Sequence, residues 1–393
     1  HSDDVAKVAS SDLTLVAIDG GDERADISYD ELVDSCSPAP PAPFARGAGS
    51  ARIVIHTSGT TGKPKGASRD TSAAGIGAIA NIIGRVPYRR DDIVFCPAPL
   101  FHSFGLATFA FGTVLGATLV LPDRFDPEDS LRWIDERKAT AASFVPVMIR
   151  RLVSLDDAIK QRYDVSSLRI VLASGSVLTE DLRAAARDLL GDVLYDLYGS
   201  TEVGWISIAT PEDMRTRPGT VGHPVDGIDV AIFGPDGDRL PPGQPGELYI
   251  KSDVHFEGYT SGETKDEREG YMSVGDLGYM DDDGYLYVSS RSDDMVIIGG
   301  ENVYPVEIEQ VIESVPGVEE VTVLGMEDEE YGSVLAAFAV GSASAEAIRA
   351  ACEAQLASFK VPRRIEVLPE LPRTSTGKVV KRELLAQLQE TAT

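Results

Sequence analysis

The sequence predicts an α/β fold with a large N-terminal domain and a small, mobile α+β C-terminal domain. In the large domain we expect a doubly wound, mostly parallel sheet and a small antiparallel β unit. Up to Trp205, apolar strands alternate with helical stretches, the pattern of a parallel sheet covered by helices. Beyond it, Gly and Pro turns separate short strands, and strands and helices mix again from Arg291. We therefore expect domains at residues 1–290, with the β unit at about 206–290, and at 291–393.

The front of the chain alternates strand and helix in order. A strand at Leu13–Ile18 and a helix at Tyr29–Val33 lead into a Pro/Ala connector at 37–43, which is expected to be stiff and extended. Strands of the large sheet are predicted at Ala51–His56, Ile93–Cys96, Leu119–Leu121, Ala142–Val145 and Ile170–Ala173. Helices are predicted at Ser72–Ile83, Pro127–Arg137 and Glu180–Leu190.

One apolar run needs a separate interpretation. Phe104 to Leu121 holds 18 uncharged residues, the lower limit for crossing a bilayer. Its glycines and threonines favour a division into a buried helix ending near Gly116 and a strand at Ala117–Leu121. We therefore expect no integral membrane segment.

The second half of the chain is predicted in shorter pieces. The β unit should contain strands at Val230–Phe233, Gly246–Ile250 and Gly284–Ser289. The C-terminal domain should contain helices at Pro305–Val315, Ala345–Ala357 and Lys381–Gln389, and strands at Val318–Leu324 and Ala336–Val340.

Composition limits the partners. There are 36 Lys and Arg against 63 Asp and Glu, a net charge of −27, which argues against nucleic acid or an anionic membrane as the main partner. The three cysteines are far apart, and the five histidines form no zinc-binding pattern. An odd cysteine number without a disulfide framework suits a reducing compartment, so we expect a cytoplasmic protein.

The densest polar segment is Thr57 to Gly66 (TSGTTGKPKG), directly after a predicted strand. Its hydroxyl and backbone N–H groups can donate to an anion, and two lysines add charge, the composition of a phosphate-binding loop. The spacing is too short for a Walker A loop, and Pro64 stands where such a loop carries the hydroxyl that binds magnesium. We favour a phosphate loop over a solvated turn because a buried strand leads into it.

Further motifs follow this loop in order. They are Tyr198-Gly-Ser-Thr-Glu202, Gly246-Glu-Leu248 with Gly258-Tyr259, Gly275-Asp276-Leu277 with Asp283-Gly284-Tyr285, Arg291-Ser-Asp-Asp294 with Ile298 to Pro305, and Pro372 to Lys378. Together they resemble the motifs of the AMP-forming adenylating enzymes, which include acyl- and aryl-CoA ligases. The resemblance covers nearly the whole chain. That family has a longer stretch before its phosphate loop than the 56 residues here, so we expect a shortened front, which leaves room for a homodimer contact.

The resemblance implies ATP, Mg²⁺ and CoA as ligands, and it assigns residues to them. The nucleotide-binding set is Thr57, Ser58, Gly59, Thr60, Thr61, Lys65, Gly175, Ser176, Tyr198, Asp276 and Arg291. In this set Tyr198 would stack on adenine and Asp276 would accept hydrogen bonds from the ribose diol. In the catalytic set, Thr201 would donate to the α-phosphate, Glu202 would bind the metal, and Lys378 would bridge the acyl carboxylate and the α-phosphate.

Each assignment has a structural alternative. Thr201 and Glu202 could cap a helix, Tyr198 could be core, Asp276 could lie in a plain turn, and Lys378 could be a solvated loop lysine.

The resemblance also implies a C-terminal domain that swings between half-reactions. Asp293 would act as the hinge, and Gly299 and Gly300 would line the path of CoA. The acyl pocket would be lined by His102, Phe104, Val147 and Val203, with His102 either a gate or a satisfied core histidine. This lining has no Asp to pair with an ammonium group, which disfavours an α-amino acid substrate.

The predicted function is an ATP-dependent carboxylate–CoA ligase that activates an apolar acyl or aryl acid. Joining the acid to AMP converts a poor leaving group into a good one, which a thiol can displace. The alternatives are a ligase that loads the phosphopantetheine of a separate carrier protein, and a non-catalytic relative that binds nucleotide or acyl-adenylate.

Overall fold

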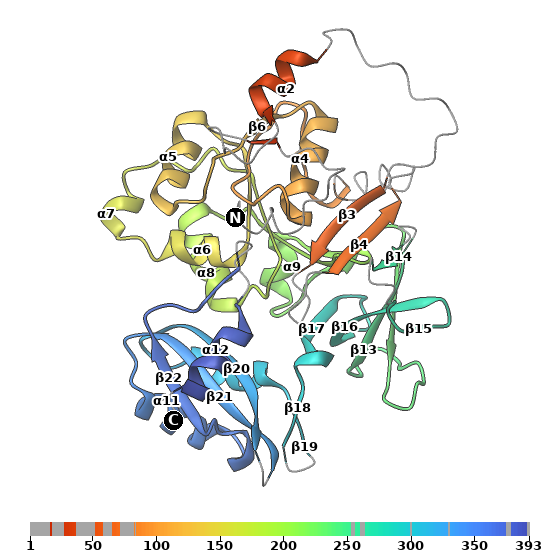
Figure 1. The fold of residues 1–393 in the computed structure, drawn as a ribbon, viewed down its shortest axis with the longest axis vertical. Helices are drawn as coiled ribbons and strands as arrows, with labels where there is room; N and C mark the ends of the chain where they lie inside the picture. Colours follow the sequence, from red (N-terminus) through yellow and green to blue (C-terminus); the bar gives the residue numbers. More distant parts are fainter. Residues whose placement is uncertain are drawn as a thin grey trace. The chain divides into compact units, whose positions relative to one another are not determined.

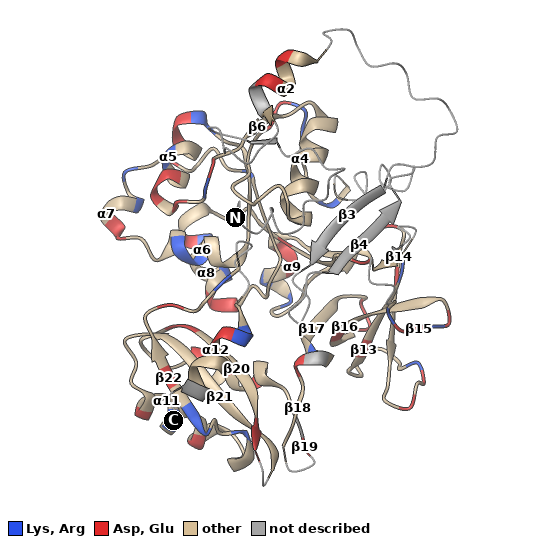
Figure 2. Cartoon of the chain, viewed as in Figure 1, with Lys and Arg blue, Asp and Glu red and all other residues tan. Residues whose placement is uncertain are grey.

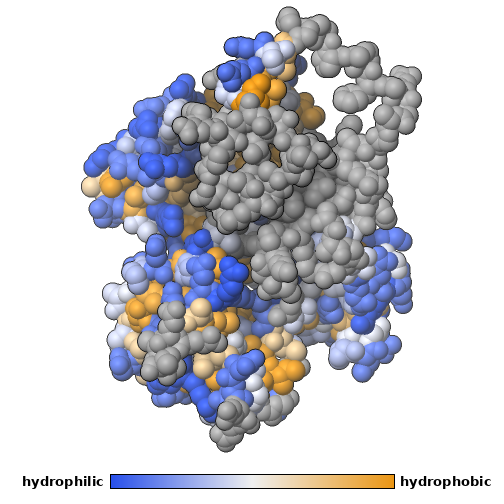
Figure 3. Space-filling view, viewed as in Figure 1, coloured by the Kyte–Doolittle hydropathy of each residue, from blue (hydrophilic) through white to orange (hydrophobic). Residues whose placement is uncertain are grey.

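The computed structural model describes residues 16–17, 27–36, 52–57, 65–70, 82, 84–252, 256–259, 264–298, 301–328, 331–374 and 379–390. The chain divides into two compact units, residues 1–49 and 50–393. In the first unit, β1 (Val16–Ala17) pairs in parallel with β2 (Ile27–Ser28). Helix α2 (Tyr29–Ser35) begins at a capping box formed by Ser28 and Glu31 and exposes apolar side chains, seen in orange in Figure 3.

The second unit is organised around a seven-stranded sheet with the order β11-β10-β9-β8-β7-β5-β6 (Figure 1). Its strands are β5 (Ile93–Phe95), β6 (Thr118–Val120), β7 (Ala141–Phe144), β8 (Ile170–Ser174), β9 (Leu194–Ser200), β10 (Gly204–Ala209) and β11 (His223–Pro224). The strands from β6 to β9 run in parallel, and β10 and β11 are antiparallel additions. The predicted doubly wound, mostly parallel sheet is confirmed.

Two helices that cover this sheet begin at N-capping residues that can be recognised in the sequence. Helices α5 (Pro127–Arg137) and α8 (Glu180–Leu190) have the predicted bounds, because Asp126 and Thr179 cap their first turns. Figure 2 shows acidic and basic residues along both helices. Their apolar residues Leu131, Ile134 and Leu182 belong to the same core cluster as the strands of the sheet. The remaining helices are α6 (Pro146–Val153), α7 (Asp157–Lys160) and α9 (Pro211–Thr216).

The 18-residue apolar run divides as predicted. It forms α4 (Ser103–Leu115) and then β6, with Gly116 in the left-handed conformation at the end of the helix. Within the ranges that the structure describes, no helix has both the length and the apolar character that a membrane crossing requires.

The strand predicted at Ala51–His56 belongs to a different sheet from the one expected. It is β3 (Arg52–Thr57), which pairs antiparallel with β4 (Lys65–Asp70), and β4 pairs with β14 (Phe256–Tyr259). Two strands joined by a short connection pair with each other more readily than with a distant sheet. The helix predicted at Ser72–Ile83 lies almost wholly outside the described residues.

The small antiparallel β unit is confirmed and is larger than predicted. It contains β12 (Ile228–Phe233), β13 (Gly246–Ser252), β15 (Glu267–Arg268), β16 (Tyr271–Met280) and β17 (Leu286–Arg291). β16 lies at its centre, pairing with β13, β15 and β17. One face of these strands packs with Val203 and Ile206 of the β9–β10 hairpin in a second core cluster.

The C-terminal region has a core of its own. After η1 (Ser292–Asp294), β18 (Val296–Ile298) and β19 (Glu301–Val303) form a hairpin. The sheet β20 (Val318–Asp328), β21 (Gly332–Gly341) and β22 (Arg364–Leu368) packs against α10 (Pro305–Glu313) and α11 (Ala345–Gln355) in one cluster, and against α12 (Lys381–Glu390) in another. A short helix, η2 (Ser358–Lys360), precedes β22. This small α+β arrangement was predicted; a domain boundary at residue 290 stays a prediction.

Candidate nucleotide and acyl site

Gly175, Ser176 and Tyr198 of the candidate nucleotide set lie at the carboxyl edge of the parallel sheet. Ser174 at the end of β8 pairs with Leu197 of β9, and its Oγ donates to the Leu197 carbonyl oxygen at 2.8 Å. Gly175 and Ser176 therefore follow directly beside Tyr198. Gly175 has φ of 101°, a conformation that a residue with a Cβ rarely adopts. Ligands of open α/β sheets bind at this edge.

Thr201 and Glu202 lie in the tight turn between β9 and β10. The turn is closed by pairing of Ser200 with Gly204, and a Cβ on Gly199 would lie 2.2 Å from the Gly204 carbonyl oxygen. Only glycine permits this approach, so the Gly of the Tyr198–Glu202 motif shapes the turn. The alternative of a helix N-cap for Thr201 and Glu202 is wrong, because an antiparallel strand follows.

Glu202 is held as a carboxylate by its neighbours. Tyr259 of β14 donates to Glu202 Oε1 at 2.5 Å. Burial raises the pKa of the Glu202 carboxyl, but hydrogen bonds from Tyr259, its own backbone and Ser200, with the charge of Lys265, outweigh it and lower the pKa. The sequence did not reveal the Tyr259 contact, which joins residues 57 positions apart.

The same tyrosine connects Glu202 to the predicted phosphate loop. Tyr259 pairs with Ala67 of β4, and β4 pairs with β3 so that Lys65 lies opposite Thr57. The backbones of Thr57 and Lys65 thus bring the two ends of the loop together. Ser58, Gly59, Thr60 and Thr61 lie outside the described residues, as do the side chains of Thr57 and Lys65.

A second tyrosine joins the sheet to the β unit. Tyr198 donates its hydroxyl to Asp276 Oδ2 at 2.5 Å, and Arg291 Nη1 lies 3.5 Å from Asp276 Oδ1. Asp276 pairs with Arg291 across β16 and β17, so the ion pair follows from strand register. Burial, with the Asp276 charge, raises the pKa of Tyr198 well above its usual value, so the hydroxyl keeps its proton and donates. Asp276 lies in β16, so the alternative of a plain turn is wrong. Tyr198 also packs against the β-unit core cluster, so its adenine-stacking role stays a prediction.

The four candidate acyl-pocket residues do not form one group. His102 is half-buried and caps α4, its Nδ1 accepting from the Phe104 backbone N–H at 3.3 Å, and Val147 on α6 is half-buried as well. Both follow β5 and β7, where the strand order reverses, the position at which such sheets bind ligands. Phe104 is 4% exposed in the main core, and Val203 is 1% exposed in the β-unit cluster.

Several candidates cannot be placed. Gly299, Gly300 and Lys378 lie outside the described residues, and Asp293 is described only as backbone, within η1. The ends of the Lys378 loop are described: Arg373 pairs with Val379, and the Val380 N–H donates to the Pro372 carbonyl oxygen at 2.8 Å. The loop is therefore closed at its base.

A magnesium ion would need carboxylate ligands among the side chains that the structure describes. Among these, no three His, Cys, Asp or Glu residues converge on a common point. Magnesium in nucleotide sites commonly takes one or two protein carboxylates, with phosphate oxygens and waters completing the octahedron. An ionised Glu202 fits that requirement.

Comparison with known proteins gives the same assignment. Residues 2–260 match the AMP-binding enzyme family, and residues 307–378 match the AMP-binding enzyme C-terminal domain. The indoleacetate–CoA ligase of Aromatoleum aromaticum is 33% identical over 397 residues, covering 98% of this chain and 77% of that protein. The 2-succinylbenzoate–CoA ligase of Geobacillus kaustophilus is 35% identical over 347 residues, covering 86% and 69%.

A solved structure extends the likeness to three dimensions. The o-succinylbenzoate CoA synthetase of Bacillus subtilis, in complex with its acyl-adenylate intermediate, has a TM-score of 0.72 at 31% identity, covering 84% of this chain and 68% of that one. The resemblance stated from the motifs is confirmed. The chain therefore belongs to the AMP-binding enzyme family and is an AMP-forming carboxylate–CoA ligase that uses ATP and CoA.

Proposed function

We propose that this ligase activates an apolar aryl acid, with Mg²⁺ as the metal and CoA as the acyl acceptor. The reacting groups would meet at the carboxyl edge of β8 and β9. The observation that carries this proposal is the joint placement there of an ionised Glu202 and the Tyr198–Asp276 pair.

In the first half-reaction a carboxylate oxygen of the acid attacks the α-phosphorus of ATP, and pyrophosphate leaves with the electron pair. Asp276 would accept from the ribose diol, Tyr198 would stack on adenine, and Gly175 and Ser176 would let the base approach. Magnesium, held by Glu202, would neutralise charge on the phosphate oxygens. The loop from Thr57 to Lys65 would hold the departing pyrophosphate.

Two further groups act on the reacting atoms in this proposal. Thr201 would donate to an α-phosphate oxygen from the hairpin turn, and Lys378 would place positive charge between the acyl carboxylate and the α-phosphate. Both act where negative charge increases in the transition state, which is where a fixed donor lowers the barrier most.

In the second half-reaction the CoA sulfur attacks the acyl carbon, AMP leaves with the bonding electrons, and the thiol proton passes to solvent. We propose that residues 291–393 rotate about Asp293 between these steps, so that Lys378 withdraws and Gly299 and Gly300 line the path of CoA. The separate hydrophobic clusters of the C-terminal region support this proposal, because a part with its own core can move as a body.

Two observations bear on the class of acid. His102 and Val147 are half-buried at the reversal of strand order, and neither carries a carboxylate that would pair with an ammonium group, which disfavours an α-amino acid. Two relatives are named for indoleacetate and 2-succinylbenzoate, both aryl acids. We also propose a cytoplasmic location, which the free thiols of Cys36, Cys96 and Cys352 support.

Pyrophosphate release with a panel of acids tests the proposal. Indoleacetate, benzoate, octanoate and phenylalanine are each supplied with ATP and Mg²⁺, with CoA, with a phosphopantetheinyl carrier protein, or with neither. We expect release with aryl acids and thioester formation with CoA. No release with any acid would contradict the site assignment, a preference for octanoate would contradict the aryl acid, and thioester formation on the carrier alone would contradict CoA. Gel filtration of the same preparation checks for a homodimer.

The metal role is tested by one substitution and a matched control. Glu202→Gln should raise the Mg²⁺ concentration needed for half-maximal release about tenfold or more, because a neutral amide binds the ion weakly. Glu212→Gln removes an exposed carboxylate from α9 and should leave the Mg²⁺ dependence unchanged. Equal effects of the two substitutions would refute the assignment of Glu202.

A further inference from the structure

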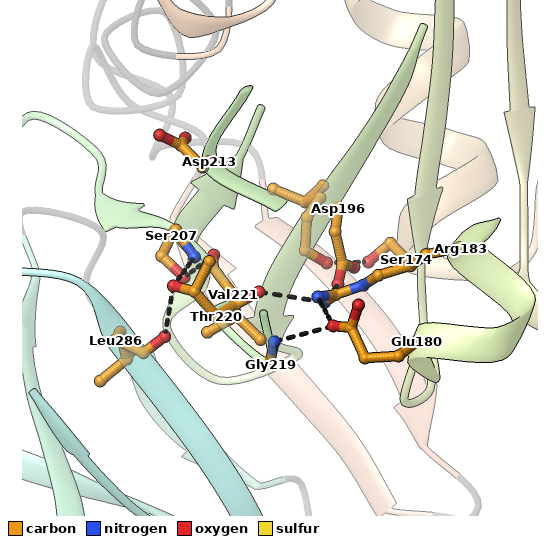
Figure 4. Close-up of polar contacts among 12 residues, drawn as sticks. Ser174, Glu180, Arg183, Asp196, Ser207, Asp213, Gly219, Thr220, Val221 and Leu286 are labelled. Atoms are coloured by element: carbon orange, nitrogen blue, oxygen red, sulfur yellow. Dashed lines mark hydrogen bonds and ion pairs between the residues drawn. The ribbon is translucent and has the colours of Figure 1, made fainter. Parts of the chain in front are cut away.

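The candidate nucleotide site has two halves, Tyr198 on β9 and Asp276 on β16, and a buried arginine outside the site connects the parts of the fold that carry them. Arg183 of α8 is 7% exposed and Asp196 of β9 is 5% exposed. Arg183 Nη2 donates to Asp196 Oδ2 at 2.8 Å and to the Thr220 carbonyl oxygen at 3.0 Å (Figure 4). One guanidinium therefore holds both a strand of the parallel sheet and the segment that leads toward the β unit.

A second connection strengthens the first. Arg183 Nη1 donates to Glu180 Oε1 at 2.8 Å, and the same Glu180 oxygen accepts from the Gly219 backbone N–H at 2.7 Å. Figure 4 shows Glu180 and Arg183 side by side on α8, facing Gly219 and Thr220. The loop at 219–220 is thus tied to the helix through two separate atoms of its backbone.

The same loop is tied to β17 on its other side. Thr220 Oγ1 donates to the Leu286 carbonyl oxygen at 3.0 Å, and the Val221 N–H donates to the same oxygen at 2.9 Å. The Leu286 N–H donates in turn to the Gly222 carbonyl oxygen at 2.9 Å. β17 ends at Arg291 and pairs with β16, which carries Asp276. This chain of hydrogen bonds therefore links α8, through the 219–222 loop and β17, to the strand that carries Asp276.

At its other end, this chain of hydrogen bonds begins at Asp196, which lies on β9 close to Tyr198, the residue proposed to stack on adenine. Asp196 and Tyr198 are two residues apart on β9, so their side chains point to the same face of the sheet. Tyr198 then meets Asp276 at 2.5 Å. A shift of β17 against β9 would separate these two groups.

We propose that Arg183 and Asp196 are positioning residues that set the register between the Tyr198 half and the Asp276 half of the nucleotide site. This inference rests on the proposed nucleotide roles of Tyr198 and Asp276. A buried ion pair often adds no more stability than apolar residues of equal volume, whereas its directed hydrogen bonds fix one geometry. The pair touches no substrate atom in this assignment and acts through strand placement.

The sheet contains a matched pair that lacks this connection. Arg169 Nη2 lies 2.5 Å from Asp92 Oδ1, and Asp92 is 2% exposed. Asp92 also accepts from Thr140 Oγ1 at 2.7 Å and from the Arg89 N–H at 2.6 Å. These residues lie before β5, β7 and β8, at the edge of the sheet opposite the candidate site. Their replacement should cost stability and leave the nucleotide site in place.

The test compares AMP with 2′,3′-dideoxy-AMP by isothermal titration calorimetry on the full chain. If Asp276 accepts from the ribose diol, the wild type should prefer AMP about tenfold. In Arg183→Met/Asp196→Asn we expect AMP affinity to fall about tenfold and this preference to approach one. In Arg169→Met/Asp92→Asn both values should stay within about twofold of wild type at a comparable fall in the unfolding midpoint.

Each outcome bears on the proposal. Equal changes in the two double variants would overturn the positioning role and leave the proposed function intact. A wild type that does not bind AMP would overturn both. If Arg183→Met/Asp196→Asn does not fold, Arg183→Lys replaces it, because lysine keeps the charge and loses the planar guanidinium that reaches Glu180, Asp196 and Thr220 at once. Unchanged AMP preference in that folded variant would also refute the proposal.

Discussion

Two half-buried glutamates show how differently the nucleotide-site region and the C-terminal region treat a carboxyl group. Burial raises the pKa of both Glu202 and Glu309. At Glu202 the hydrogen bonds from Tyr259, its own backbone and Ser200 reverse this effect and lower the pKa. Glu309 on α10 accepts from the Val323 N–H at 2.7 Å, and its pKa stays raised to about 7. The number of donors, rather than burial alone, decides which carboxyl is ionised.

The two regions also contribute different groups to the proposed reaction. The candidate groups at the edge of the parallel sheet lie on strands or, like Glu202, in the turn between two strands, and tyrosine hydroxyls support Glu202 and Asp276. The candidate charge-supplying lysine belongs instead to a loop of the C-terminal region, whose base is closed by Arg373 and Val379. The two half-reactions should therefore respond separately to substitutions in the two regions.

The largest expected effect is at Lys378. Lys378→Ala should slow adenylate formation about 10³-fold, because a positive charge is lost where negative charge develops. Thioester formation from preformed acyl-adenylate should continue, since that step does not use the lysine in our assignment. Pyrophosphate release and thioester formation are measured separately. Lys360→Ala, which removes a lysine paired with Glu307 in the same region, should leave both rates nearly unchanged. Equal loss of both steps in Lys378→Ala would refute the division.

Glu309 should make stability depend on pH. Its pKa in the folded chain, about 7, lies above its usual value of 4.5. The folded state therefore binds the proton more tightly, and this stabilisation is full below pH 4.5 and lost as the pH rises through 7. Glu309→Gln should be more stable than wild type at pH 8, by about 3 kcal/mol at most, and should lose this advantage toward low pH.

Urea unfolding of wild type and Glu309→Gln at pH 5.5 and pH 8 measures this difference. The exposed Glu370 provides a control, because Glu370→Gln should not change stability at either pH. A stability difference for Glu309→Gln that does not grow with pH would show that the carboxyl is not protonated in the folded chain.

Asp276 should affect ATP binding more than turnover. Asp276→Asn removes the charge that accepts from the ribose diol and from Tyr198, so we expect KM for ATP to rise about 20-fold with a smaller change in kcat. The β unit contains a second hydrogen bond of the same kind, in which the Tyr271 hydroxyl donates to Asp229 Oδ2 at 2.5 Å. Asp229→Asn should leave KM for ATP unchanged, and a similar rise there would point to a general loss of β-unit structure.

The smallest expected effect is at the Tyr198 hydroxyl. Tyr198→Phe keeps the ring that would stack on adenine and loses only the hydrogen bond to Asp276. KM for ATP should rise about threefold to fivefold. Tyr271→Phe is the matched control and should cause no rise. An effect of Tyr198→Phe as large as that of Asp276→Asn would mean that the carboxylate acts mainly on the tyrosine.

Much of the fold could be predicted because its signals are local. The bounds of α5 and α8 follow from Asp126 and Thr179 at their N-caps, and the division of the run from Phe104 follows from Gly116. The sheet of β3 and β4 was not predicted correctly, since an apolar strand looks the same whether its partner is parallel or antiparallel. The residues of the candidate site were found through motifs, whereas the contacts that orient them were not.

The sequence by itself determined the family, the parallel sheet and the identity of the candidate groups, because each is recorded in residues close together along the chain. Only the tertiary structure decided that Tyr198 meets Asp276, that Tyr259 meets Glu202, and that Arg183 joins Asp196 to Thr220. These partners lie on different strands and helices, and their distances depend on how the elements pack. Local propensity fixes an element; long-range packing fixes which side chains it meets.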